Sequence, residues 1–234
     1  MRLMTTATAL AIVRDLRPQS FGATAPGKVP NPVVEPLWAG IRVLAAVAGE
    51  DSALLDETGE PVTDQPMVEA SLRRAVAADD LILDGFLTKQ VSHDGTGVYV
   101  GADPLPATGK LIAQSMVGSR RDRRAEAIEH YEREHEARTF GPSDTIVFVA
   151  IDLLHLDGDP LLDVPLLERK RLLEAVVSES DLVRRGAYVR PPIDTWIHSW
   201  KALGFMGLSY KAANGHYRPG GVKDDWATSS MPRR

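Results

Sequence analysis

Short apolar runs with β-branched residues recur along the chain between segments with helical spacing of apolar residues. Runs of the first kind predict buried strands. They lie at 41–49, 80–91, 144–156, 182–190 and 205–213. The run DTIVFVAIDLLHL at 144–156 is nearly all apolar, so it predicts a central strand that is buried on both faces.

Helical spacing predicts four helices, at 64–78, 108–138, 163–177 and 194–203. Asp64, Asp163 and Asp194 are candidate caps for three of them. Residues 17–36 are rich in Pro, Gly and small residues, which indicates an irregular lead-in. Strands and helices mix without a strict βαβ rhythm. We therefore expect an α+β fold with mainly antiparallel sheets.

The composition fits one large domain, or one domain with extensions, because the chain has 234 residues of which 44% are hydrophobic. It has no cysteine, which excludes disulfides and thiolate metal sites. The six histidines show no metal-ligand spacing. No apolar run approaches the roughly 18 residues that span a membrane, and the N-terminus favours an arm over a signal peptide. We expect a cytoplasmic protein without a metal or a membrane contact, and its oligomeric state stays open.

The net charge of -5 argues against a general nucleic-acid binder, but the charge is unevenly distributed. Residues 184–234 hold nine Lys or Arg and three Asp or Glu, which gives +6. This basic last quarter either faces phosphates or forms a solvated rim. Trp196 and Trp200 lie four apart on a predicted helix, which is more typical of core packing than of a base-stacking platform.

Residues 35–42 read EPLWAGIR, and the stretches 83–86, 150–158 and 206–211 read LDGF, AIDLLHLDG and MGLSYK. In this order they resemble the motifs of the adenylation domain of ATP-dependent DNA ligases, especially the bacterial end-joining type. The first family motif is Lys-x-Asp-Gly-x-Arg. Gly40 and Arg42 match it, whereas Leu37 and Ala39 stand in place of the lysine and the aspartate.

The later motifs are also altered at their charged positions. Phe86 replaces the glutamate of LDGE, and Met206 replaces the glutamate of EGxxxK, in which Lys211 is kept. Ile151 stands where the family has the aromatic residue that stacks on adenine. Thr228 and Ser230 occupy the lysine positions of the last motif, W-x-K-x-K, which begins at Trp226.

The resemblance covers about residues 30–230 and implies the ligase-type nucleotidyltransferase fold, which is ATP-grasp-like. That fold has two twisted antiparallel sheets flanked by helices around a nucleotide cleft. We expect an N-terminal arm at 1–29, an adenylation-like domain at 30–234, and no C-terminal OB domain.

In the family, the first-motif lysine attacks the α-phosphate of ATP and forms lysyl-AMP, for which it needs a nitrogen lone pair. Leu37 has none, and Phe86 and Met206 offer no oxygen to a hard cation. We therefore expect no catalytic residue and no cofactor, although the family uses ATP and magnesium. We also expect Leu37, Phe86 and Met206, with Ile151, to fill the former cleft.

Three functions compete. The first is a catalytically inactive, ligase-like pseudoenzyme that binds DNA or a partner in DNA repair or recombination. The second is a protein-interaction or oligomer module without nucleic acid. The third is an active DNA ligase or nucleotidyltransferase with a displaced lysine, for which Lys28 and Lys89 are candidates.

Four residues are candidate contacts. By family analogy, Lys211 contacts a nucleotide, and Arg42 either contacts a phosphate or ribose or pairs with a carboxylate. Arg218 and Lys223 are candidates for contacts with DNA.

Overall fold

The computed structural model describes residues 8–90, 141 and 144–232. Its larger sheet has six strands in the order β4-β3-β5-β6-β7, with β8 pairing β6 as well. All of its pairings are antiparallel except that of β6 with β8. The strands are β3 (Ile41–Ala48), β4 (Asp51–Asp56), β5 (Asp80–Gln90), β6 (Thr145–Leu156), β7 (Asp159–Pro160) and β8 (Val183–Arg185).

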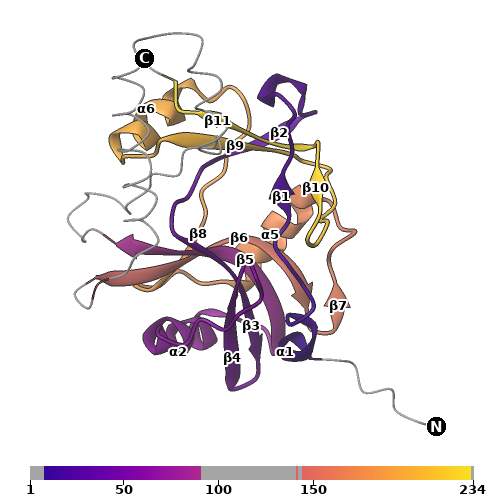
Figure 1. The fold of residues 1–234 in the computed structure, drawn as a ribbon, viewed down its shortest axis with the longest axis vertical. Helices are drawn as coiled ribbons and strands as arrows, with labels where there is room; N and C mark the ends of the chain where they lie inside the picture. The colour runs from indigo at the N-terminus through magenta and orange to yellow at the C-terminus, as the bar shows by residue number, and fades with distance from the viewer. Residues whose placement is uncertain (1–7, 91–140, 142–143, 233–234) are drawn as a thin grey trace.

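A smaller antiparallel sheet, ordered β11-β9-β2, lies above the larger one in the view of Figure 1. It contains β2 (Pro32–Pro36), β9 (Gly207–Ala212) and β11 (Trp226–Ser230). A two-stranded parallel pair joins residues near the N-terminus to residues near the C-terminus, through β1 (Ser20–Phe21) and β10 (Val222–Lys223). The fold class is therefore α+β with two main sheets, as the sequence predicts.

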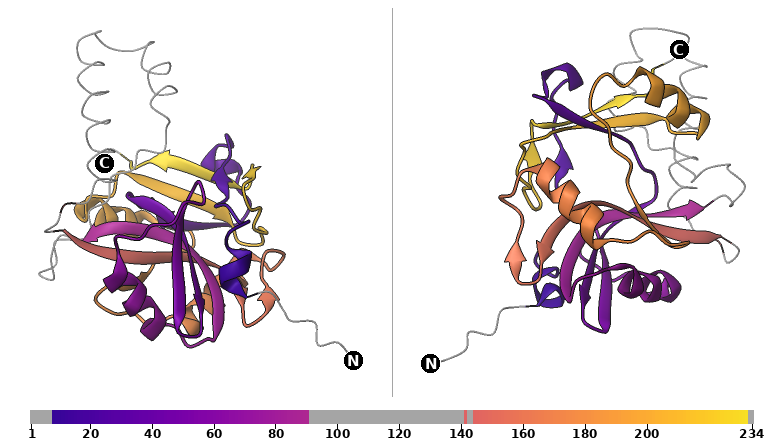
Figure 2. Two further views of the ribbon diagram at one scale, coloured as in Figure 1. Left: turned by 60° about the horizontal axis from the view of Figure 1, so that its bottom comes forward. Right: turned by 180° about the vertical axis from the view of Figure 1, so that it is seen from behind.

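Helices cover both faces of the larger sheet (Figure 2). On one face, Leu72 of α2 (Pro66–Ala75) and Leu173 of α5 (Leu166–Val176) pack with Val43 and Phe148. On the other, α1 (Ala9–Ile12) and α6 (Asp194–Ala202) pack at different places. A short 3-10 helix, η1 (Pro26–Lys28), precedes β2. No helix in the described ranges is long and apolar enough to cross a membrane.

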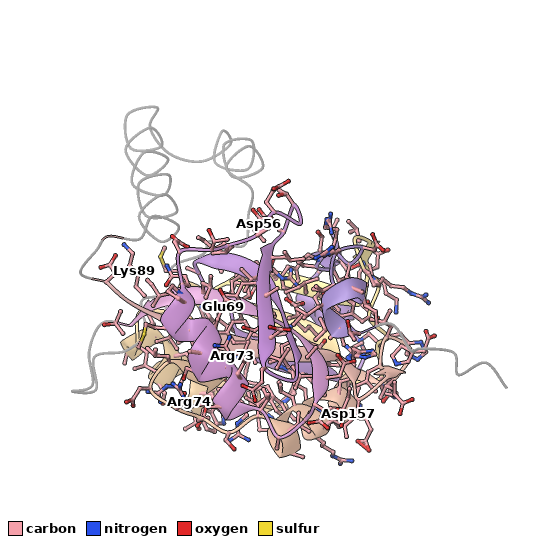
Figure 3. All side chains as sticks on the ribbon, turned by 90° about the horizontal axis from the view of Figure 1, so that it is seen from below. Asp56, Glu69, Arg73, Arg74, Lys89 and Asp157 are labelled. Atoms are coloured by element: carbon pink, nitrogen blue, oxygen red, sulfur yellow. The ribbon has the colours of Figure 1, made fainter. Side chains whose placement is uncertain are left out.

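The outer side of α2 carries charged residues that form hydrogen bonds with Ser52 of strand β4. Arg73 donates to the hydroxyl of Ser52 over 2.6 Å, and that hydroxyl donates to Glu69 over 3.1 Å. Glu69, Arg73 and Arg74 are labelled on this helix in Figure 3. The apolar stripe of α2 faces the sheet with Val68, Leu72 and Ala75, so the helix has the amphipathic pattern that its sequence predicts.

The central strand β6 is buried on both faces because its alternate residues enter different clusters. Ile146 and Phe148 pack beneath the sheet, while Val147 and Val149 pack above it. Its pairing with β5 shifts twice, and Ile151 is the extra residue at one shift, since Ala150 pairs with Gly85 and Asp152 pairs with Asp84. Such a bulge re-aims the residues that follow it.

The structure corrects the prediction that residues 17–36 are irregular. They contain β1, η1 and β2. The prolines of β2 misled the pattern because they stand at its two ends, Pro32 and Pro36, where a missing N–H is tolerated. The strands β4 and β11 were also not predicted. β11 reads WATSS and is too polar and too short for the hydrophobic pattern.

Two further predictions were wrong. The strand predicted at 182–190 ends at Arg185, and only Val189 makes a later isolated bridge, to Val34. The aspartates expected to cap helices do not do so. The N-cap residues are Gln65, Pro165 and Ile193, none with a side-chain cap hydrogen bond. The helix predicted at 108–138 lies outside the described residues.

Gly85 tests the packing of β5 against β6. A Cβ atom there would lie 2.4 Å from the carbonyl oxygen of Val149 and 2.5 Å from the Phe148 ring. We expect Gly85→Ala to lower the free energy of unfolding by about 1–3 kcal/mol, because neither group can move freely in a close-packed sheet. Urea unfolding followed by circular dichroism measures the change.

Gly27→Ala is the matched control, because a Cβ at position 27 meets nothing within 4 Å. Equal stability of the Gly85→Ala and Gly27→Ala proteins would contradict the predicted packing.

Candidate functional site

The segment between β2 and β3 carries the chain from the smaller sheet into the larger one. Leu37 donates its N–H to the Gly207 carbonyl of β9 over 2.9 Å, and the side chains of Leu37, Trp38 and Ala39 are buried. Gly40 has a φ of 132°, and a Cβ there would lie 2.0 Å from the carbonyl oxygen of Leu87. Glycine at this position therefore serves the backbone path.

Phe86 and Ile151 meet in one apolar cluster, which we call the α6 cluster. Trp38 belongs to it and packs edge-on against Phe205 with 5.0 Å between ring centroids. The buried members are Val34, Trp38, Ala39, Val147, Val149, Ile151, Ile197, Trp200, Phe205, Leu208 and Met231, with Phe86 packed against them.

The other two predicted cleft-filling residues are not members of the α6 cluster. Leu37 is buried and directly precedes Trp38, a member of the cluster. Met206 is half-buried, and its carbonyl oxygen accepts the N–H of Met231 over 2.7 Å. The structure therefore brings together two of the four side chains, Phe86 and Ile151.

Arg42 is held by partners within the protein. It donates from two nitrogens to Asp84, over 3.1 and 2.7 Å, and from a third to the backbone carbonyl of Gln19 over 2.8 Å. The hydroxyl of Tyr217 donates to the same carboxylate over 2.8 Å. Burial alone would lower the pKa of Arg42, but the Asp84 carboxylate outweighs it and raises the pKa. Arg42 therefore pairs with a carboxylate, which was one of its two expected roles.

Lys211 lies in a buried ion triad with Glu35 and Lys170. Its ammonium is 2.7 Å from Glu35, whose other oxygen pairs with Lys170. The three side chains are at most 3% exposed. Lys170 also donates to the carbonyl of Ile151, the bulged residue of β6, and Lys211 lies 4.5 Å from the Trp226 ring centroid. The triad thus joins β2 and β9 of the smaller sheet to α5 and β6.

Burial and the two cations pull the pKa of Glu35 in opposite directions. Burial would raise this pKa, but Lys170 and Lys211 together lower it to about 2. The pKa of Lys211 is lowered, first by burial and also by the charge of Lys170. Two ammonium groups share one carboxylate here, so the site has no spare negative charge to balance a further cation.

A second buried pair supports the same junction. Arg169 of α5 donates to both oxygens of Asp152, over 2.8 and 2.7 Å, and both side chains are fully buried. Arg169 also donates to the carbonyl oxygens of Val164 and Gly215. Sequence reasoning did not single out Asp152, Arg169, Glu35 or Lys170. The available signal was a charge inside a largely apolar strand, as in VVEP and AIDLL.

The remaining candidates lie apart from the triad. Thr228 lies on β11 opposite Ser209 and is half-buried. Ser230 lies on the same strand opposite Gly207 and is exposed. Arg218 is exposed, and its backbone N–H donates to Gln19. Lys223 pairs with Asp225 over 2.7 Å.

The two candidate replacement nucleophiles are on different elements. Lys89, near the end of β5 and labelled in Figure 3, pairs with Asp144 over 3.3 Å. Lys28 is exposed in η1. Neither has a described partner that resembles an activating base.

The chain is similar in sequence to known DNA ligases. It is 30% identical over 209 residues to a probable DNA ligase of Streptomyces avermitilis, covering 87% of this chain and 36% of that protein. It is 26% identical over 199 residues to a DNA ligase of Pyrobaculum neutrophilum, covering 83% of this chain and 30% of that protein. The chain spans about a third of the length of these relatives. No protein-family profile matches it.

The fold is that of a ligase catalytic domain. The structure superposes on the ligase domain of LigD from M. tuberculosis with a TM-score of 0.62 and 20% identity, over 93% of this chain and 60% of that one. Sequence and fold together identify this chain as a relative of the adenylation domain of ATP-dependent DNA ligases.

The residues of this chain do not fit ATP and magnesium as that family uses them. Position 37 has no amine, and positions 86 and 206 have no oxygen ligand. Arg42 and Lys211 are already paired with Asp84 and Glu35. In the described ranges, no group of three or more His, Cys, Asp or Glu could hold a metal ion.

Glu35→Gln tests the ion triad. The change leaves Lys170 and Lys211 buried beside a neutral amide, so we expect the free energy of unfolding at neutral pH to fall by about 3–5 kcal/mol. The pKa of Glu35 falls from 4.5 to about 2 on folding. Its stabilisation is therefore complete above about pH 4.5 and is lost as the pH falls toward 2.

Denaturant unfolding of the wild type and Glu35→Gln between neutral pH and pH 2 measures this dependence. The difference between the two proteins should shrink as the pH falls. Glu50→Gln, at an exposed turn, is the control and should follow the wild type. A Glu35→Gln protein as stable as the wild type at neutral pH would show that the triad does not stabilise the fold.

Proposed function

We propose that this relative of the ligase adenylation domain forms no covalent adenylate and acts as a binding module in DNA repair. The observation that carries the proposal is Leu37, a buried aliphatic side chain where the family has the attacking lysine. An aliphatic group has no lone pair with which to displace pyrophosphate from ATP.

The ion pairs of the charged residues that match the family motifs support this proposal. Arg42 and Lys211 match the family motifs, and both are buried in ion pairs within the protein. Releasing Arg42 toward a phosphate would leave Asp84 buried without its cationic partner, which is unfavourable. Releasing Lys211 would break one of the two buried ion pairs of Glu35. The motif residues that remain in this chain thus have a structural role that does not depend on a nucleotide.

DNA is the partner that the fold and the charge distribution favour. Residues 184–234 carry +6, and Arg218 and Lys223 lie on the turn-rich connection between β9 and β11. Arg218 is exposed, and Lys223 keeps a third of its side chain accessible beside Asp225. Cations on an exposed connection can approach a phosphate backbone and release its counterions.

Incubation with radiolabelled ATP and magnesium tests the absence of catalysis. We expect no acid-stable protein–AMP adduct from the wild type. Leu37→Lys should not restore the adduct, because the oxygen ligands at positions 86 and 206 and the lysines at 228 and 230 are also absent. An active ATP-dependent DNA ligase is the positive control.

Mass spectrometry of any labelled protein would locate an adduct. An AMP group on Lys28, Lys89 or any other lysine of the wild type would establish the displaced-lysine alternative and overturn this proposal.

Electrophoretic mobility shifts with nicked duplex DNA test the binding role. We expect binding that weakens with salt, and we expect Arg218→Ala/Lys223→Ala to reduce the affinity about tenfold and the salt slope by about 2. Arg74→Ala/Arg171→Ala changes the net charge equally at exposed positions on α2 and α5 and is the matched control. If wild type binds no duplex even at low salt, the DNA role is excluded.

A further inference from the structure

A cavity of about 600 Å³ opens between α5, the segment that follows β8, and α6. This size is typical of pockets that bury a ligand or a side chain with its neighbours. The connection from β8 to α6 passes from the larger sheet to the level of the smaller one in Figure 1, and Val189 within it pairs with Val34. None of the motif positions 37, 86 and 206 lines the cavity.

Aromatic residues form part of the lining. Trp196 of α6 is 47% exposed, which is unusual for a residue of its size. Its ring centroid lies 6.0 Å from that of the buried Trp200, so the ring packs against Trp200 while part of it faces solvent. Trp196, Tyr188 and Arg185 all line the cavity, and these three residue types are enriched at the centres of protein interfaces.

The sequence expectation that both tryptophans pack in the core is thus correct only for Trp200. Trp196 lies one helical turn before Trp200, and no apolar neighbour in the described chain buries the Trp196 ring. An exposed indole beside a concavity indicates a contact surface.

The charges that line the cavity favour a cationic occupant. The Lys170 ammonium is fully buried, where it shares the Glu35 carboxylate with Lys211, so it is not among the groups that an occupant meets at the mouth of the cavity. Arg185 donates from its side chain to the backbone carbonyl of Glu174 over 3.0 Å, and its N–H donates to the Glu179 carboxylate over 3.1 Å. The four charged lining residues sum to zero, but Glu174 and Glu179 are exposed carboxylates beside the single half-buried guanidinium of Arg185, so the accessible groups sum to -1.

The aromatic rings act in the same direction as the carboxylates. A cation over the face of Trp or Tyr gains about 0.5–2 kcal/mol. The ammonium of Lys170 already lies 5.2 Å from the Tyr188 ring centroid, on the inner side of the cavity. Burial and a hydrogen bond to Glu174 raise the pKa of Tyr188, which keeps its phenol neutral. A phosphate group at the mouth of the cavity would instead face two exposed carboxylates and one guanidinium.

We propose that this cavity is a docking site for an arginine side chain presented by a peptide segment of a protein partner. The guanidinium stacks on Trp196 and pairs with Glu174 and Glu179. Arginine suits the site better than lysine because its planar group both stacks and binds carboxylates through two donors. The proposal rests on the cavity alone and does not depend on whether the protein binds DNA.

Nuclear magnetic resonance of the full chain tests the docking site. The chain has four tryptophans, so we expect four indole N–H signals, and the signal that Trp196→Phe removes is that of Trp196. The probes are acetyl-Gly-Gly-Arg-Gly-Gly-amide, the same peptide with glutamate in place of arginine, and a thymidine oligonucleotide. We expect the arginine peptide alone to shift the Trp196 signal saturably, with an apparent Kd of about a millimolar.

Two variants assign the effect to the cavity. Glu174→Gln/Glu179→Gln should weaken the arginine peptide about tenfold, whereas Glu168→Gln, an exposed residue of the same helix, should not. In Trp196→Ala, the arginine peptide should no longer shift the amide signals of Gly186 and Ala187, which also line the cavity. Leu203→Ala, at another exposed position near α6, is the control and should keep these shifts. All five substituted positions are exposed, so these variants are expected to fold.

Two results would overturn the docking site. One is an arginine peptide that leaves the Trp196 signal unchanged, or that binds the double glutamine variant as tightly as wild type. The other is a shift of the same signal by the glutamate peptide or the oligonucleotide in preference to the arginine peptide, which would assign the cavity to an anionic partner.

Discussion

The ion triad of Glu35, Lys170 and Lys211 is the interaction on which the junction of the two sheets depends. It connects β2 and β9 to α5 and, through the Ile151 carbonyl, to the central strand β6. Ions removed from water are stable only with partners in good geometry, so the triad allows few alternative placements of the smaller sheet. The neighbouring pairs Arg42–Asp84 and Arg169–Asp152 add the same requirement at two further points.

This arrangement accounts for a motif frame that persists without reactive groups. Gly40 permits close passage of the backbone, and Arg42 and Lys211 satisfy buried carboxylates. These residues are needed for the fold whether or not a nucleotide is bound. Positions 37, 86 and 206, by contrast, hold apolar side chains. Of these, Phe86 packs with Ile151 in the α6 cluster. Structural and chemical roles within one motif are therefore separable in this protein.

The sequence predicted the elements whose pattern is long and regular. The strands β3, β5, β6 and β9 and the helices α2, α5 and α6 are near their predicted ranges, because burial imposes a clear periodicity on each of them. β2 and β11 escaped prediction since their stability comes from pairing with β9, which a local pattern does not contain. The order of the motifs gave the fold, but not the partners of Glu35 or Asp84, because pairing of distant charges is decided by the tertiary structure.

The parallel pairing of β1 with β10 has a consequence for how the chain reaches its native state. The backbone N–H of Gln19 donates to the Tyr217 hydroxyl across a separation of 198 residues, and Ser20 pairs with Val222. Contacts between such distant segments close very large loops, which slows folding. During synthesis, residues 17–22 emerge from the ribosome long before their partners do. Chaperone protection of this early segment would matter most until residues 217–223 have also been synthesised.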